Sequence, residues 1–122
     1  MIADNQPTAA ISQAPLLRPG NTNCAGCGMS LGLRWLQEGL DGDAPYMVIP
    51  ACCGIVTAGA FPTTSYGAAV AASTFASSPA LASGIASVLA MNGEKNPVIC
   101  WTGDGGTYDI GMATLSAAAE RN

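Results

Sequence analysis

The sequence of 122 residues has no histidine, only four lysine and arginine residues, and no long hydrophobic run. Eight acidic residues give a net charge of −4, which argues against a nucleic-acid-binding groove, because such a groove carries a basic patch. No apolar stretch reaches the roughly 20 residues of a membrane span, and the N-terminus lacks the basic-then-apolar order of a signal peptide. A cytoplasmic protein that contacts neither membrane nor nucleic acid is therefore expected.

Charged residues are also scarce, at 10% of the chain against about 25% in a typical soluble domain. Much of the surface is therefore expected to be covered by other protein. Hydrophobic residues make up 49% of the chain, which is enough for the packed core of one domain or part of one. Residues 1–20 contain three prolines without periodicity and are expected to form an extended arm outside the core, whereas residues 21–122 hold the folded part.

Apolar spacing and end signals predict helices and strands in alternation from residue 29 onward. This order is typical of an open, mostly parallel, doubly wound α/β sheet, in which ligands bind beyond the carboxyl ends of the strands. In chain order, the expected elements are a helix from Met29 to Gly39 or Gly42, a strand at Tyr46–Ile49, a loop at Ala51–Tyr66, a helix from Ser77 or Ser78 to Asn92, a strand at Pro97–Trp101, and a helix from Ile110 to Glu120 capped by Asp109.

A glycine-rich segment, Gly103-Asp104-Gly105-Gly106, directly follows the second predicted strand. Glycines let the backbone approach a phosphate closely, and the start of the following helix favours an anion. Since a carboxylate repels a phosphate, Asp104 requires a cation between them, and Mg²⁺ prefers carboxylate and phosphate oxygens. The segment thus predicts a site for a metal-bridged diphosphate. The alternative is a plain strand-to-helix turn in which Asp104 only caps the helix.

Five cysteines are an odd set for a secreted disulfide framework, and clustered cysteines in a reducing compartment indicate metal or redox chemistry. Cys24 and Cys27 form a CxxC pair at the predicted start of the first helix, which suits a thiol–disulfide pair, half of a zinc site, or part of an iron–sulfur cage. Zinc would require a second CxxC or a histidine pair, and the sequence has neither. A thiol–disulfide pair of the thioredoxin type would follow a strand, whereas this pair follows a turn-rich segment.

Together the strings "NTNCAGCG" and "GDGGTYDIG" resemble the beta subunits of 2-oxoacid:ferredoxin oxidoreductases, over most of the chain from about Arg18. The resemblance implies a thiamine diphosphate-binding domain of which residues 21–122 are the N-terminal part. Asp104 would bind the Mg²⁺ that holds the diphosphate, and Gly103, Gly105 and Gly106 would surround it. No residue of this chain is expected to act as a catalytic acid or base.

The same resemblance implies a [4Fe–4S] cluster held by Cys24, Cys27 and either Cys52 or Cys53. Because adjacent residues of an extended loop point to opposite sides, only one of the last two is expected to bind. Cys100 is interpreted as a core residue, since free cysteine is often buried. The fourth cluster ligand and further Mg²⁺ ligands are expected beyond residue 122, in a longer beta subunit.

The activity implied by the resemblance is oxidative decarboxylation of a 2-oxoacid such as pyruvate, or cleavage of oxalate, with electrons passing through the cluster to ferredoxin. Asn21, where many relatives have histidine, keeps oxalate open as a substrate. The implied partners are the other subunits of the enzyme, ferredoxin and a small substrate, with coenzyme A as a further candidate. The alternative function is a non-enzymatic thiol redox or metal-binding module that uses the CxxC pair alone. A brown, acid-labile colour would distinguish the cluster from that module.

Overall fold

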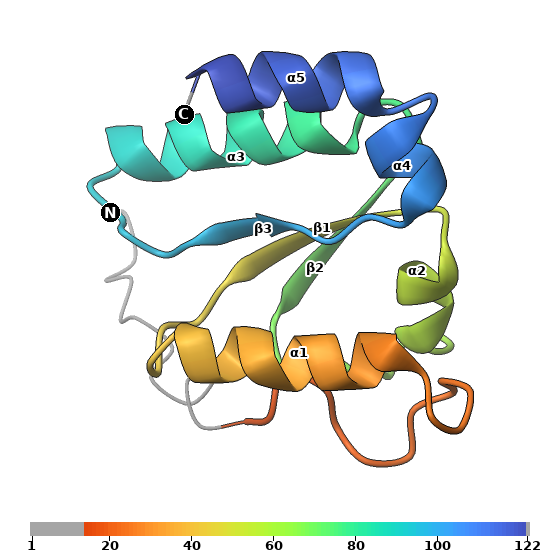
Figure 1. Ribbon diagram of the computed structural model, residues 1–122. Coiled ribbons are helices and arrows are strands. Elements are labelled where there is room, and N and C mark those ends of the chain that lie inside the picture. Colours follow the sequence, from red (N-terminus) through yellow and green to blue (C-terminus); the bar gives the residue numbers. More distant parts are fainter. Residues whose placement is uncertain (1–13, 122) are drawn as a thin grey trace.

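A computed structural model describes residues 14–121 of the chain, which fold around one short parallel sheet (Figure 1). The elements in chain order are α1 (Gly28–Gly39), β1 (Tyr46–Pro50), α2 (Cys53–Thr57), β2 (Ala69–Ser73), α3 (Ser78–Met91), β3 (Val98–Cys100), α4 (Asp104–Tyr108) and α5 (Met112–Arg121).

The sheet has the strand order β2-β1-β3, and both pairings are parallel. Tyr46 at the start of β1 is in register with Ala69 of β2 and with Val98 of β3. All three strands therefore end at the same edge of the sheet. This arrangement confirms the predicted α/β class with an open parallel sheet.

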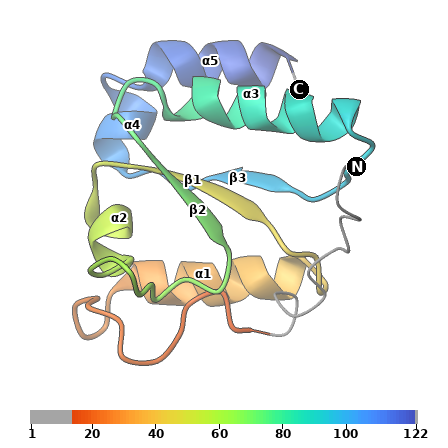
Figure 2. The same cartoon turned by 180° about the vertical axis from the view of Figure 1, so that it is seen from behind.

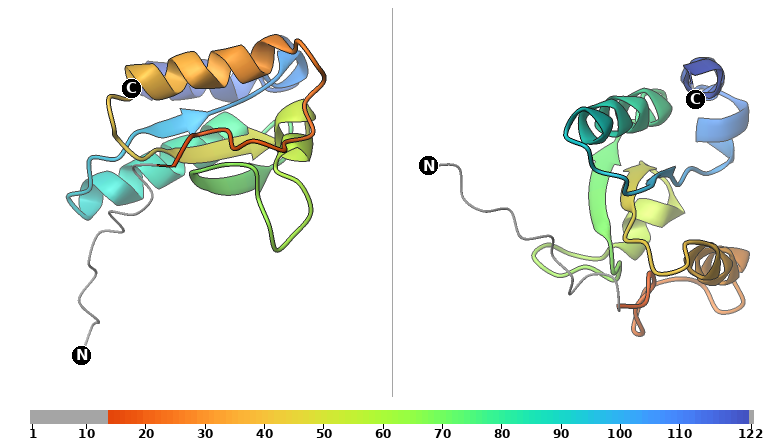
Figure 3. Two further views of the ribbon diagram at one scale, coloured as in Figure 1. Left: turned by 90° about the horizontal axis from the view of Figure 1, so that it is seen from below. Right: turned by 90° about the vertical axis from the view of Figure 1, so that its left-hand side faces the viewer.

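Helices cover both faces of the sheet, with α1 on one face and α3 with α5 on the other (Figures 1 and 2). Figure 3 gives the same layers from below and from the side. Along β1, Met47 and Ile49 belong to the core cluster that contains Leu33 of α1. Val48, between them, is buried too but is not part of that cluster. Side chains alternate between the faces of a strand, so Val48 points toward the layer of α3.

The core cluster on the α1 face confirms the first helix, which was predicted from apolar spacing. Leu33 is fully buried, and Met29, Leu36 and Leu40 pack against the cluster from the same helix. Leu16 is also part of this cluster and is 3% exposed, which corrects the expectation that residues 1–20 lie outside the core. Residues 1–13 of the predicted arm lie outside the described part of the chain.

Several expected boundaries are wrong, and the errors share one cause. Helix α2 interrupts the loop expected at 51–66, and the residues of β2 were not expected to form a strand. Helix α5 begins at Met112, and Asp109 lies at the C-terminal end of α4. These elements are short or consist of small residues, so tertiary contacts rather than local propensity decide their conformation.

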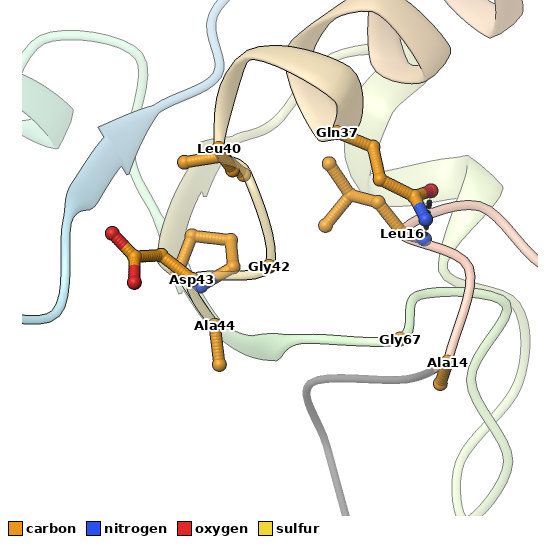
Figure 4. A pocket seen from close by; sticks show the side chains of 9 residues that line it. Ala14, Leu16, Gln37, Leu40, Gly42, Asp43, Ala44 and Gly67 are labelled. Atoms are coloured by element: carbon orange, nitrogen blue, oxygen red, sulfur yellow. Dashed lines mark hydrogen bonds between the residues drawn. The ribbon is translucent and has the colours of Figure 1, made fainter.

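A small cavity of about 90 Å³ lies at the opposite edge of the sheet, before the strands begin (Figure 4). It is bordered by Ala44 and Pro45 before β1, by Gly67 before β2, and by Gln37 of α1. The Leu16 amide donates a hydrogen bond of 2.8 Å to the Gln37 side-chain oxygen there. Ligand pockets usually measure about 300–1,000 Å³, so this cavity is too small for a cofactor.

A larger groove of about 520 Å³ lies between α3, α5 and β3, and it is lined mainly by alanine and serine. Cys100 borders this groove and is half-buried rather than fully buried, which corrects its interpretation as a core residue. Burial raises the pKa of the Cys100 thiol. Among residues 14–121, no helix is long and apolar enough to cross a membrane.

Candidate functional site

The candidate site lies at the edge where the three parallel strands end. The chain continues from β1 into Cys52 and α2, and from β3 into Gly103 and α4, and both short helices lie on the same side of the molecule (Figure 1). A Cβ atom added at Gly103 would lie 3.6 Å from the Cβ atom of Cys52. The glycine-rich segment and one of the two adjacent cysteines are therefore direct neighbours, as their positions after parallel strands require.

The glycine-rich segment forms the start of α4 rather than the loop that was expected. Gly103 is the N-cap residue with extended backbone, and the Thr107 hydroxyl donates to its carbonyl oxygen over 2.8 Å. Gly106 is buried, and a Cβ atom there would collide with the Thr102 hydroxyl oxygen. At Gly105 a Cβ atom would touch the Phe75 ring at 3.5 Å. The glycines thus make room for close packing of the turn against Thr102 and Phe75.

Asp104 is exposed in the first turn of α4. Gly103, and not Asp104, is the N-cap residue of α4, and no side chain caps this helix. The Asp104 carboxylate is therefore not used as the helix cap. An exposed carboxylate beside glycine backbone suits the oxygen coordination of Mg²⁺ between protein and phosphate. The residues present at this turn therefore fit the predicted diphosphate group.

The CxxC pair lies where the chain enters α1. Cys27 is the N-cap of α1, and its amide donates to the Cys24 carbonyl oxygen over 3.0 Å. Gly26 between them has φ of +76°, a conformation that glycine adopts without steric cost. Cys24 is exposed and Cys27 is half-buried, and both thiols are free. The turn thus holds the two cysteines close together at the end of one helix.

The second cysteine pair differs from the extended loop that was expected. Cys52 has extended backbone and is the N-cap of α2, whereas Cys53 is the first residue of that helix. Cys52 is half-buried and packs against the core cluster, and Cys53 is exposed. A Cβ atom at Gly54 would lie 3.3 Å from the Cys52 sulfur and 3.2 Å from the Trp101 ring. The Cys52 sulfur and the Trp101 ring therefore both lie close to Gly54.

Hydrogen bonds hold the segment before the CxxC pair against α2. The Thr22 hydroxyl donates to the Val56 carbonyl oxygen over 3.3 Å, and the Thr57 hydroxyl donates to the Asn23 side-chain oxygen. The two cysteine segments are neighbours in this way. Within residues 14–121, however, no three His, Cys, Asp or Glu side chains are grouped closely enough to hold a metal ion. The cysteines therefore do not form a complete thiolate cage as placed, and cluster binding stays a prediction.

Tyr66 is a residue of this region that the sequence did not single out. Its ring is 1% exposed, and its hydroxyl donates to the Gly54 carbonyl oxygen over 2.7 Å in the first turn of α2. Burial and the nearby Cys52 raise the pKa of Tyr66 from 10.0 to about 12, against a smaller lowering by a hydrogen bond with Thr57. No sequence pattern indicates this hydrogen bond, because Tyr66 is a single tyrosine among glycine and threonine residues.

Tyr66 is expected to ionise only as the pH approaches about 12, well above the ordinary tyrosine value of 10.0. Because the raised pKa means that folding favours the neutral phenol, Tyr66 stabilises the folded state. This contribution is complete below pH 10 and is lost as the pH rises toward about 12. Ultraviolet absorbance of tyrosinate measures the titration. Tyr66→Phe should remove this late step and lower the free energy of unfolding by about 1 kcal/mol, because the bond to Gly54 is lost. A late step that persists in Tyr66→Phe would contradict the assignment.

Comparison with known proteins gives a family match over the site. Residues 51–122, more than half of the chain, match the family described as thiamine pyrophosphate enzyme, C-terminal TPP binding domain. The matched region contains the glycine-rich segment and the second cysteine pair, whereas the CxxC pair lies before it.

Individual relatives are similar to this chain over most of its length. Ketoisovalerate oxidoreductase subunit VorB of Pyrococcus horikoshii is 42% identical over 108 residues, which cover 84% of this chain and 34% of VorB. Pyruvate synthase subunit PorB of Methanothermobacter thermautotrophicus is 33% identical over 112 residues, which cover 91% of this chain and 38% of PorB. The chain thus spans just over a third of the length of the curated relatives that it matches.

Proposed function

Because this chain belongs to the family of thiamine pyrophosphate enzymes with a C-terminal TPP-binding domain, we propose that it forms the diphosphate-binding part of a 2-oxoacid:ferredoxin oxidoreductase beta subunit. The observation that carries the proposal is the Gly103–Gly106 turn at the carboxyl end of β3, with the exposed carboxylate of Asp104. When bound, thiamine diphosphate supplies the carbon nucleophile that attacks a 2-oxoacid carbonyl.

The contribution of this chain is to bind and orient the diphosphate. Asp104 would coordinate Mg²⁺, which removes the repulsion between carboxylate and phosphate. Gly103 and Gly105 would let the backbone approach the phosphate oxygens, and the first amides of α4 have no intrahelical acceptor. Phe75, two residues after the end of β2, borders Gly105.

A 2-oxoacid of the ketoisovalerate or pyruvate type is the substrate class that we propose, because relatives of both names are similar to this chain. Oxalate was kept as a possible substrate because of Asn21, and the names of these relatives give no support for it. The Asn21 amide nitrogen donates to the Arg18 carbonyl oxygen over 3.0 Å, and its oxygen accepts from the Asn23 amide over 3.2 Å. Asn21 therefore has a local role in closing the turn before the cysteines.

Ferredoxin, coenzyme A and the other subunits of such an enzyme are the partners that the proposal implies. Isothermal titration of the complete complex with thiamine diphosphate tests the central claim. Binding should require Mg²⁺, and ferredoxin reduction should follow on addition of ketoisovalerate or pyruvate. Binding that is absent, or equally strong without Mg²⁺, would overturn the proposal for the Gly103–Gly106 turn.

Cys24, Cys27 and Cys52 are the thiols that we propose as ligands of a [4Fe–4S] cluster. The half-buried Cys52 next to Gly103 supports this choice over the exposed Cys53. Cys52→Ser should therefore lower iron and acid-labile sulfide at least about fivefold in the complete complex, whereas Cys53→Ser should retain most of both. The two serine variants are matched controls for each other. Equal, mild losses would remove both cysteines from the cluster.

A further inference from the structure

We propose that Asn23 and Thr57 are positioning residues that fix the separation between the Cys24–Cys27 segment and the Cys52–Cys53 segment. This inference deepens the proposed function and rests on it for the identity of the thiolate-bound group. It does not require either side chain to touch that group. The carrying observation is a buried hydroxyl between two segments 34 residues apart in the sequence.

Thr57 is a buried polar residue at the end of a short helix. It is the last residue of α2 and is 2% exposed. Its hydroxyl hydrogen-bonds the Asn23 side-chain oxygen and lies 2.9 Å from the Cys53 carbonyl oxygen. Buried hydroxyls are costly without partners, so the two acceptors account for the position of Thr57. One of them belongs to a cysteine, and the other directly precedes the first cysteine of the CxxC pair.

Asn23 also makes hydrogen bonds before and after the CxxC pair, in addition to its bond with the Thr57 hydroxyl. Its side-chain nitrogen donates to the Ser30 hydroxyl over 2.8 Å in the first turn of α1. Its backbone amide donates to the Asn21 side-chain oxygen over 3.2 Å. The residues between Asn23 and Ser30 include Cys24 and Cys27, so the position of Asn23 sets where both thiols lie relative to α2.

Helix α2 offers a fixed reference for this link. A Cβ atom at Gly54 would lie 3.0 Å from Ile49 and 3.2 Å from Trp101, so the helix packs closely on the ends of β1 and β3. The buried Tyr66 hydroxyl donates a hydrogen bond to the Gly54 carbonyl oxygen. By contrast, Thr22 makes an exposed contact of 3.3 Å with Val56. The Asn23–Thr57 bond is part-buried and is therefore the better-protected connection between the segment and the helix.

The test uses the complete complex and three substitutions. Thr57→Val keeps the shape but removes the hydroxyl, and Thr57→Ser keeps the hydroxyl. Thr114→Val is the matched control, because the Thr114 hydroxyl donates over 2.6 Å to Ala76, 38 residues away and apart from the cysteines. The measurements are iron retained during a chelator challenge, the electron paramagnetic resonance spectrum of the reduced protein, and hydrogen exchange of residues 22–30.

In Thr57→Val, iron should be released at a chelator concentration about 10- to 100-fold lower, because partners beyond the ligands typically change metal affinity by that factor. Its resonance spectrum should change and exchange in residues 22–30 should accelerate, while Thr57→Ser and Thr114→Val match the wild type. Wild-type iron retention and spectrum in Thr57→Val would overturn the proposal. If the wild-type complex holds no iron, the cluster assignment fails separately. Hydrogen exchange of residues 22–30 then tests the Asn23–Thr57 link by itself. Faster exchange in Thr57→Val alone supports the link, and unchanged exchange overturns it.

Discussion

Replacing Asp104 with alanine is expected to weaken Mg²⁺-dependent binding of thiamine diphosphate at least about 100-fold, or about 2.8 kcal/mol. The exposed carboxylate in the first turn of α4 is the group proposed to hold the cation. Without it, the diphosphate loses the metal that its charge requires. Titration calorimetry of the complete complex, with and without Mg²⁺, measures the loss.

Asp109 provides the matched control for this substitution. It is an exposed carboxylate at the other end of the same short helix, so Asp109→Ala removes one negative charge nearby and should leave the affinity within about twofold. The cluster-bound iron of Asp104→Ala should stay at the wild-type level. Unchanged affinity in Asp104→Ala, or equal losses in both variants, would exclude Asp104 as the Mg²⁺ ligand.

Gly111→Ala is expected to lower the free energy of unfolding by about 1–3 kcal/mol and to disturb diphosphate binding. A Cβ atom at Gly111 would meet the backbone of Gly106, at 2.8 Å from its Cα atom and closer to its carbonyl group. Backbone cannot move aside as the end of a side chain can. The substitution must therefore displace the glycine-rich turn, which the Gly111 amide also contacts through the Gly105 carbonyl oxygen at 3.3 Å.

Gly84→Ala is the same chemical change in open space. A Cβ atom there meets nothing within 4 Å, and Gly84 lies in the middle of α3. Alanine should therefore raise the free energy of unfolding by about 0.5–1 kcal/mol. Urea unfolding of both variants measures the contrast. A Gly111→Ala protein as stable as wild type would show that α4 and α5 can separate without cost.

The parts of the fold that the sequence predicts well are those with bulky apolar side chains at regular spacing. Helix α1 has such spacing from Met29 to Leu40, and α3 has a proline near its start and Asn92 at its end. Strand β2 consists of alanine, valine and serine, so neither alternation nor bulk marks it. Leu16 lies among prolines, and only its contacts across the core reveal that it is buried.

The candidate site was predictable where one short segment carries the chemistry. Asp104 and its flanking glycines stand out because a carboxylate between glycines after a strand has few uses. Helix α4 was not predictable, since glycine is a poor helix former and packing against Thr102 and Phe75 overrides that tendency. The bond between Asn23 and Thr57 joins two ordinary polar residues far apart in the sequence, so no local pattern indicates it.

Strand β1 lies at the centre of the sheet but is synthesised before both of its neighbours. On the ribosome, Met47, Val48 and Ile49 have no parallel partner until β2 and then β3 have been translated. At about 5–20 residues per second, that wait lasts on the order of several seconds. Helix α1 precedes β1 and can cover one face early, whereas the face of Val48 waits for α3. The nascent chain therefore exposes its most hydrophobic strand during this interval, when exposed apolar surface favours aggregation.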